Sequence, residues 1–167
     1  MVRQYEKSGA DVVPVRCDMT LTVRQAKPED LRTAAALACG VWSASPAELE
    51  QELVPMLTDP ECSVFLAEAD GVPVGFAQCG LRHDYVEGTE SSPVGYLEGV
   101  FVREDFRCRG IAALLLSECE RWAWAHGCTE FASDCEETNE DSIRFHLAHG
   151  FAEANRIVCF VKKRTTE

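Results

Sequence analysis

Basic residues are scarce in this chain of 167 residues. Only 16 Lys and Arg stand against 28 Asp and Glu, which gives a formal charge of −12 at pH 7. Nucleic acids and anionic membrane surfaces attract clustered Lys and Arg, so this balance argues against both as partners and favours a cationic ligand. The rest of the composition, 46% hydrophobic and 26% charged, is that of a globular protein with one domain.

Long apolar runs and metal-binding spacings are also missing. No stretch approaches the roughly 18 apolar residues of a membrane helix, and residues 1–18 lack the apolar core of a secretory signal. Nine cysteines are present, but none forms a C-x-x-C pair or a short Cys/His cluster, so no zinc site is predicted. We expect a cytoplasmic protein without a metal, in which an extension over 1–18 precedes a single domain over 19–167.

Hydrophobic periodicity and turn residues predict a mixed α/β fold. The expected strands cover 21–25, 62–69, 72–81, 95–102, 128–134 and 156–162. The expected helices cover 28–42, 46–57, 111–127 and 142–150, the last two ending on glycines. The polar stretch 83–93 is expected to be a surface loop, where substrate-reading residues are common.

The strongest chemical signal is the turn Arg107-Cys-Arg-Gly-Ile-Ala112, which joins a buried strand to a long helix. Glycine permits close approach of a ligand, and the free amide groups at the start of a helix attract an anion. The turn is neither a P-loop nor a G-x-G-x-x-G motif. Taken alone, it is either a phosphate site or an ordinary strand-to-helix turn.

About thirty residues later come Asn139-x-x-Ser142 and the helix exit Gly150-Phe151. With the turn at 107–112, these motifs make residues 21–162 resemble the GNAT family of acetyl-CoA-dependent N-acetyltransferases. The strings RHDYVEGTESSPVGYLEG, CTEFASDCE and GFAEANRIVCF are similar to one branch, the aminoglycoside 6'-N-acetyltransferases.

That resemblance implies a GNAT-type α/β (α+β) fold, a mixed and mostly antiparallel sheet flanked by helices. It implies transfer of acetyl from acetyl-CoA to the 6' amine of an aminoglycoside antibiotic, by direct attack in a ternary complex, which confers resistance. A homodimer formed partly by C-terminal strands is also implied. Two other functions stay open: acetylation of another polyamine or a protein amine, and a module that binds CoA or a cation without catalysis.

Glu98 and Asp134 are the candidate proton acceptor and amine anchor. The attacking amine must lose a proton, which a nearby carboxylate can take. Glu98 lies in an otherwise apolar strand, where a charge needs a function or a partner, and Asp134 ends the next strand. The resemblance places both at antibiotic-binding positions and leaves open which one is the base. Alternatively, Glu98 pairs with an arginine and Asp134 caps a helix.

The resemblance also implies the cofactor contacts. Asn139 would touch the cofactor or simply cap its helix. Backbone amides would hold the acetyl carbonyl and pantetheine arm at Val100, Phe101 and Val102. Further amides would hold the pyrophosphate beside Arg107, at Cys108, Arg109, Gly110, Ile111, Ala112 and Ala113.

His146 stands where many GNAT proteins have the tyrosine that protonates the leaving thiolate. Since a histidine is only partly protonated near pH 7, His146 is either this acid or a structural residue, and in the second case the thiolate leaves unaided. Trp42 and Tyr85 match substrate-contacting positions, and Asn155 aligns with a position that can touch the drug. Trp42 is either a ligand wall or part of the core.

Overall fold

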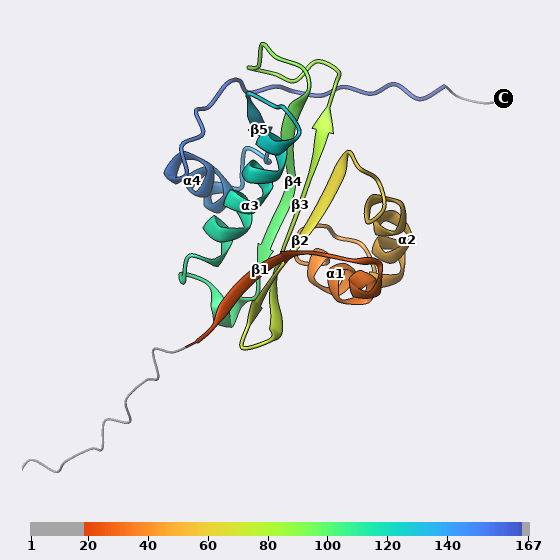
Figure 1. Cartoon of the computed structure of the whole chain (residues 1–167). Coiled ribbons are helices and arrows are strands. Elements are labelled where there is room, and N and C mark those ends of the chain that lie inside the picture. Colours follow the sequence, from red (N-terminus) through yellow and green to blue (C-terminus); the bar gives the residue numbers. More distant parts are fainter. Residues whose placement is uncertain (1–18, 165–167) are drawn as a thin grey trace, which may run out of the picture.

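The computed structural model describes residues 19–164 and contains one five-stranded sheet in the order β1-β2-β3-β4-β5 (Figure 1). The first four strands are antiparallel to their neighbours, and β5 runs parallel to β4. The predicted mixed, mostly antiparallel sheet is therefore confirmed, while the expected extension over 1–18 lies outside the described residues. The strands are β1 (Leu21–Gln25), β2 (Cys62–Ala69), β3 (Val72–Arg82), β4 (Val94–Val102) and β5 (Phe131–Ser133).

Two helices cover each face of the sheet, with α1 and α2 on one side and α3 and α4 on the other (Figure 1). The helices are α1 (Leu31–Ala38), α2 (Pro46–Met56), α3 (Ile111–Ala125) and α4 (Glu140–Ala148), with short 3-10 turns at Pro28–Asp30 and Glu104–Phe106. None of the helices within 19–164 has the length and apolarity needed to cross a membrane.

The predicted helix over 28–42 is shorter than expected. It begins as a 3-10 turn, and α1 ends at Ala38. The backbone N–H groups of Gly40 and Val41 then donate to the carbonyls three residues earlier, which forms a turn. A Cβ on Gly40 would lie 2.2 Å from the Phe101 ring, so the turn packs directly on β4. This close approach brings Trp42, the residue after the turn, to the sheet.

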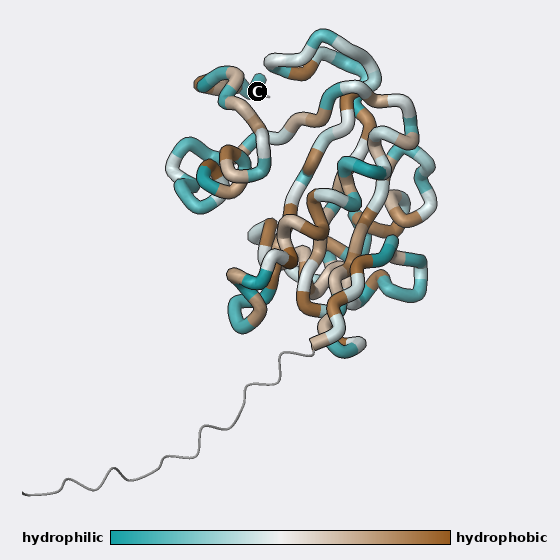
Figure 2. Tube along the Cα trace, turned by 60° about the vertical axis from the view of Figure 1, so that its left-hand side comes forward, coloured by the Kyte–Doolittle hydropathy of each residue, from teal (hydrophilic) through white to brown (hydrophobic). Residues whose placement is uncertain are grey.

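The core has two layers, one on each side of the sheet. Figure 2 shows hydrophobic residues concentrated along the strands and the helices that pack on them. The layer under α3 is built around Leu115, Cys119 and Leu97, and the layer under α1 and α2 around Leu49, Leu53 and Phe76. Ser45 and Glu48 start α2 with reciprocal hydrogen bonds, which fixes where this helix begins against the sheet.

A β-bulge in β4 controls the direction of the Glu98 side chain. Gln78 of β3 pairs with Gly99 and Cys79 pairs with Leu97, so Glu98 has no partner in β3. Leu97 belongs to the core under α3, whereas Glu98 and Gly99 both face the side of α1 and α2. Bulges break the alternation of a strand in this way, and here the break turns two consecutive residues toward the same face.

The predicted last strand, 156–162, is wrong for the single chain. Residues 151–164 have no regular secondary structure and run across the end of the molecule as an extended segment (Figure 1). Its apolar side chains are exposed, with Phe160 at 92% and Val161 at 87%. A strand needs a neighbour to satisfy its backbone groups. In the described part of the chain, the edge strand β5 pairs only with β4, over three residues. The prediction for β5 was also too long, 128–134 instead of Phe131–Ser133.

Candidate active site

Glu98 is held by an arginine that the sequence analysis did not single out. Arg82, the last residue of β3, donates from Nε and Nη2 to Glu98 Oε1 at 3.2 and 3.0 Å, and from Nη2 to Oε2 at 2.9 Å. Both side chains remain partly exposed, 42% for Arg82 and 31% for Glu98. The expected alternative, an ion pair of Glu98 with an arginine, is therefore present. A cation already lies beside the carboxylate, at the mouth of the site.

The same arginine connects Glu98 to Asp134 through Tyr96. The Arg82 Cζ lies 3.3 Å from the centre of the Tyr96 ring, close enough for a strong cation–π contact. The Tyr96 hydroxyl donates to Asp134 Oδ1 over 2.5 Å. Burial, and then the bond to Asp134, raises the pKa of Tyr96 well above its usual value, so this hydroxyl remains a donor. The two candidate carboxylates thus belong to one network.

Asp134 is more accessible than Glu98. It is exposed just beyond β5, and within residues 19–164 its Oδ2 accepts no hydrogen bond. It does not cap α4, because Asn139 has that position and accepts from the Ser142 amide at 3.1 Å. The cap leaves the Asn139 side-chain amide nitrogen available for another contact. One oxygen of Asp134 is thus fixed by Tyr96, and the other is free to meet a ligand.

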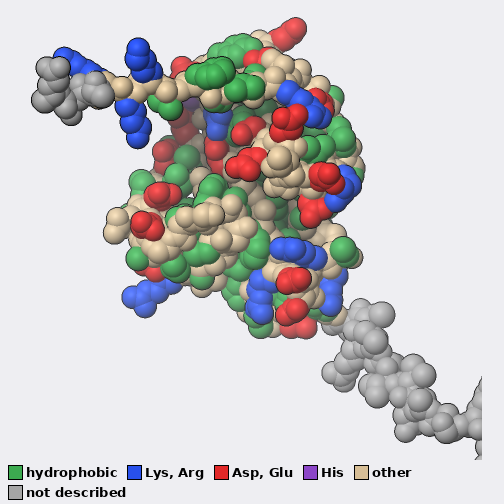
Figure 3. All heavy atoms as spheres, turned by 180° about the vertical axis from the view of Figure 1, so that it is seen from behind, with side chains coloured by type: hydrophobic (Ala, Val, Ile, Leu, Met, Phe, Trp, Pro, Cys, Tyr) green, Lys and Arg blue, Asp and Glu red, His purple; other side chains and the backbone are tan. Residues whose placement is uncertain are grey.

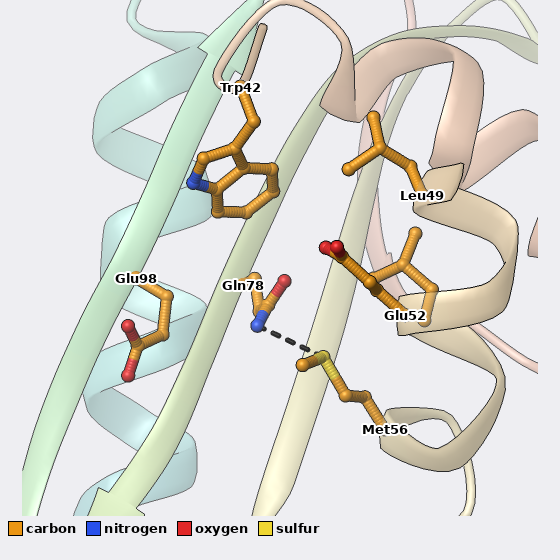
Figure 4. A pocket seen from close by; sticks show the side chains of 7 residues that line it. Trp42, Leu49, Glu52, Met56, Gln78 and Glu98 are labelled. Atoms are coloured by element: carbon orange, nitrogen blue, oxygen red, sulfur yellow. Dashed lines mark hydrogen bonds between the residues drawn. The ribbon is translucent and has the colours of Figure 1, made fainter. Parts of the chain in front are cut away.

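A pocket of about 160 Å³ opens between α2 and β4 (Figure 4). Trp42 forms one wall of the pocket and Glu98 lies on the side formed by β4. Gln78 of β3 lies between these two residues. A Cβ on Gly99 would lie 3.1 Å from Trp42 Cζ2, so the absence of a side chain there lets the indole lie against β4. Trp42 also meets Phe76 edge to face at 5.9 Å. It is therefore both a core residue and a wall of the pocket.

Tyr85 and Asn155 come together through a third residue, Glu87. The Tyr85 hydroxyl donates to Glu87 Oε2 at 2.8 Å, and Asn155 Nδ2 donates to Glu87 Oε1 at 3.1 Å. Tyr85 is 81% exposed and lines a second hollow with Arg82. Glu98 lines the first pocket and Arg82 lines the second, so the ion pair links a residue of each. Loop 83–93 and the segment after α4, far apart in sequence, therefore meet beside the site.

The free edge of β4 lies beyond the end of β5. The last pair between them joins Leu97 to Ser133, so Val100, Phe101 and Val102 pair only with β3 among the described residues. Alternate backbone groups of an antiparallel strand point away from its neighbour. This stretch of β4 can therefore add the amide groups of an extended ligand as a further strand would.

The turn before α3 has the geometry of an anion site. Gly110 has a φ of 77° at the N-cap and provides no side-chain cap, so the first amides of the helix, at Ile111, Ala112 and Ala113, have no partner within α3. The side chains of Arg107 and Arg109 donate to the carbonyls of Val102 and Asp105 at 3.1 Å. These bonds hold two cations at the turn, and each guanidinium keeps further N–H groups for a ligand.

His146 lies on α4, on the α3 side of the sheet. Its Nδ1 is 2.7 Å from the Ser142 carbonyl oxygen, which can only accept, so Nδ1 carries a hydrogen. Its Nε2 is buried and has no partner among residues 19–164. The ring packs edge to face on Phe151 at 5.0 Å. With the hydrogen on Nδ1, Nε2 is left as a buried ring nitrogen without a hydrogen-bond partner within this part of the chain.

The side of the molecule that carries this site is acidic. Figure 3 shows Asp and Glu side chains around a hollow beneath the C-terminal segment. Within residues 19–164, no group of three or more His, Cys, Asp or Glu is arranged to hold a metal. Arg82 and Tyr96 are the members of the network that sequence reasoning missed. The only signal for Tyr96 is its place two residues before Glu98, which puts both on one face of a strand.

Comparisons with known proteins identify similar sequences and similar folds. The model of the acetyltransferase (GNAT) family matches residues 27–151. The aminoglycoside N(6')-acetyltransferase type 1 of Stenotrophomonas maltophilia is 46% identical over 140 residues, which cover 83% of this chain and 91% of that protein.

Two solved structures of AAC(6')-Iy are also similar. Its complex with CoA has a TM-score of 0.85 at 36% identity and covers 90% of this chain and 99% of that one. Its complex with the bisubstrate analogue CoA-S-monomethyl-acetylneamine has a TM-score of 0.82 at 37% identity, with coverages of 87% and 99%.

Proposed function

Because this chain belongs to the acetyltransferase (GNAT) family, we propose that it is an aminoglycoside 6'-N-acetyltransferase that uses acetyl-CoA and confers antibiotic resistance. The observation that carries this proposal is the network of Glu98 and Asp134 beside a free β4 edge and a helix N-terminus. The relatives named aminoglycoside N(6')-acetyltransferase, and the neighbour bound to a CoA–aminoglycoside analogue, support the substrate pair. The acidic composition suits a polycationic drug.

Acetyl-CoA supplies an acetyl thioester, and the residues of this chain fit its parts. Amides at the free edge of β4, Val100 to Val102, would bind the pantetheine arm and stabilise the negative charge that develops on the acetyl oxygen. Asn139 would add a contact near α4. The pyrophosphate would bind at the start of α3, to Cys108, Arg109, Gly110, Ile111, Ala112 and Ala113 beside Arg107.

Asp134 is the base in this proposal, and Glu98 anchors the amine. The free Oδ2 of Asp134 accepts a proton from the substrate ammonium, directly or through a water, which frees the nitrogen lone pair. Both oxygens of Glu98 already contact Arg82, so Glu98 is better suited to hold charge than to take a proton. Trp42, Tyr85 and Asn155 would contact the sugar rings.

His146 is the acid in this proposal. As the amine nitrogen bonds to the acetyl carbon and the carbon–sulfur bond breaks, His146 Nε2 gives its proton to the leaving sulfur. The proton that the nitrogen loses in becoming an amide restores His146 through solvent. The buried Nε2 without a protein partner supports this role. A His146→Asn variant keeps a polar side chain but cannot give this proton, so steady-state kinetics should show a lower kcat.

The first test is release of free CoA thiol from acetyl-CoA with kanamycin, with its 6'-hydroxyl relative, with spermidine and with a lysine peptide. We expect rapid release with kanamycin and none with the hydroxyl relative. Faster turnover of spermidine or of the peptide would favour a different amine substrate. A protein that binds acetyl-CoA but is silent with all four would contradict the proposal.

Two variants test the assignment of roles. Asp134→Asn should lower kcat by about 100-fold or more, since general base catalysis contributes about 10²–10⁴. Glu98→Gln should mainly raise KM for the drug. If instead Glu98→Gln abolishes kcat and Asp134→Asn changes only KM, the roles are reversed.

We also propose where the protein acts, which residues form its domain and how it assembles. The protein acts in the cytoplasm, where acetyl-CoA is made, as one GNAT domain over residues 19–167. It forms a homodimer through the segment around residues 156–162. The exposed apolar side chains of that segment support the dimer, since they lie uncovered in the single chain.

A further inference from the structure

The pocket between α2 and β4 has an end that the proposed chemistry does not use. Figure 4 shows the Glu52 carboxylate reaching in from α2, directed between Trp42 and Gln78. Glu98, on the β4 side, is balanced by Arg82. No Lys or Arg lines the pocket, and Glu52 has no ion pair with any residue from 19 to 164. The negative charge at this end is therefore uncompensated.

Gln78 gives an independent indication of a ligand. Its side chain lines the pocket although the residue is only 7% exposed. Its Nε2 donates to the Met56 sulfur at 3.1 Å, which is a weak acceptor, and within residues 19–164 its Oε1 accepts from no group. Oε1 is not among the buried atoms that lack a partner, so it is an acceptor open to the pocket. A ligand that brings N–H or O–H groups into the pocket can donate to it.

The other walls suit the ring of an aminosugar. Leu49, Leu53 and Met56 form an apolar side on α2, against which the C–H face of a sugar can pack. The indole of Trp42 can bind an ammonium over its face. The volume of about 160 Å³ is below the roughly 300–1,000 Å³ of pockets that hold a whole drug, so one ring fits.

We propose that Glu52 and Gln78 form a subsite for a second ammonium group of the substrate, on a part of the molecule other than the reacting amine. Glu52 binds the ammonium, Gln78 Oε1 accepts from a neighbouring N–H or O–H, and Trp42 covers the ring. This inference rests on the proposed function. In this subsite, Glu52 raises the affinity for substrates with several amines and takes no part in proton transfer.

The test compares Glu52→Gln with Glu50→Gln on two substrates. Glu50 lies on the same helix, outside the pocket, so its variant has the same change in charge without a change in the subsite. The substrates are kanamycin, which has several amines, and methyl 6-amino-6-deoxyglucoside, which has only the reacting one. We expect Glu52→Gln to raise KM for kanamycin about 10-fold, the low end for a charged hydrogen bond, with kcat unchanged. KM for the monoamine should stay within about twofold of the parent, as should both values in Glu50→Gln.

Two results would overturn the subsite: equal KM changes in both variants, which indicate long-range charge alone, and an equal rise for both substrates in Glu52→Gln. Calorimetric titration of kanamycin into the parent and Glu52→Gln separates this inference from the proposed function. Binding that weakens about 10-fold in Glu52→Gln, in a protein that acetylates neither substrate, would support the subsite and contradict the enzyme. A parent protein that does not bind kanamycin would contradict both.

Discussion

At the scale of single residues, the main feature is that one arginine and one tyrosine join the two carboxylates of the site. Arg82 contacts both oxygens of Glu98, and its guanidinium lies over the Tyr96 ring, whose hydroxyl donates to Asp134. A cationic substrate that approaches Glu98 therefore meets a carboxylate whose charge is already partly balanced. The network holds the two acidic groups in place before any ligand binds, which is what a preorganised site requires.

Removing the Tyr96 hydroxyl should impair catalysis through Asp134. In Tyr96→Phe the ring still supports Arg82, but Asp134 loses the donor that fixes Oδ1. We expect kcat to fall about 10-fold, which corresponds to about 1.4 kcal/mol, with KM for acetyl-CoA unchanged. Steady-state kinetics of the single variants and of Tyr96→Phe/Asp134→Asn form a double-mutant cycle. The double variant should be no slower than Asp134→Asn, and additive losses would mean that Tyr96 acts independently of Asp134.

Away from the site, a second ion pair should make stability depend on pH. Arg24 lies 2.7 Å from Asp30, and its hydrogen bonds lower the pKa of Asp30 from 3.8 to about 2. A carboxyl with a depressed pKa stabilises the fold at pH values above its unfolded pKa, and this stabilisation is lost as the pH falls from about 4 to 2. Since Arg24 is 40% exposed, solvent screening limits the contribution to about 1 kcal/mol.

Asp30→Asn tests this pair. Urea unfolding should show a loss of about 1 kcal/mol at pH 7, and the difference from the parent should disappear near pH 2. Glu29→Gln, at the exposed neighbouring position, should match the parent at every pH. A loss in Asp30→Asn that persists unchanged at pH 2 would show that the charge of Asp30 is not its source.

At the scale of elements, the bulge in β4 and the turn after α1 build the pocket together. The turn after α1 contacts β4 at Gly99, since a Cβ there would lie 2.6 Å from Val41 Cγ1 and 3.1 Å from Trp42 Cζ2. Gly99→Ala should push this turn away from β4. We expect a loss of about 1–3 kcal/mol in the free energy of unfolding, as for other overpacked positions, and a raised KM for the drug because Trp42 is displaced.

Gly80→Ala is the control for this prediction. Gly80 lies in the adjacent strand β3, and a Cβ there would meet the Glu61 carbonyl oxygen at 3.4 Å and the Cys62 sulfur at 3.7 Å, which are ordinary contacts. Its unfolding free energy and KM should stay near those of the parent. Equal losses in both variants would mean that the effect is a general cost of side chains in the sheet.

The predicted helices and strands agree with the observed ones in most positions and differ from them at the site. Periodicity and turn residues predicted four of the strands and all four helices near their observed positions, because apolar runs and Gly or Pro residues mark these elements in the local sequence. They could not predict the bulge at Glu98, which depends on the pairing of β3 with β4 and leaves no mark in the local pattern. Arg82 ends a strand and reads as an ordinary surface residue until the fold places it beside Glu98 and Tyr96.

At the scale of the whole molecule, the wrongly predicted last strand bears on assembly. RIVCFV has the composition of a strand, yet its side chains are exposed in the single chain, for example Ile157 at 69% and Val158 at 77%. The pattern predicts that this segment forms a strand when another strand lies beside it. Within residues 19–164 of the single chain, it pairs with no strand. A second copy would supply both a neighbouring strand and an apolar surface.

The proposed dimer therefore depends on this segment. In Phe160→Asp, a charge replaces a large apolar side chain that is 92% exposed. We expect the dimer to dissociate at least 10-fold more readily, since the cost of burying an unpaired carboxylate exceeds about 1.4 kcal/mol. Light scattering after gel filtration, over a range of protein concentrations, measures this. Val72→Asp, at a half-exposed position in the β2–β3 hairpin, changes the charge equally and should leave the dimer intact. If the parent is a monomer at all concentrations, or if both variants dissociate equally, residues 156–162 do not form the interface, and their exposed apolar side chains need another explanation.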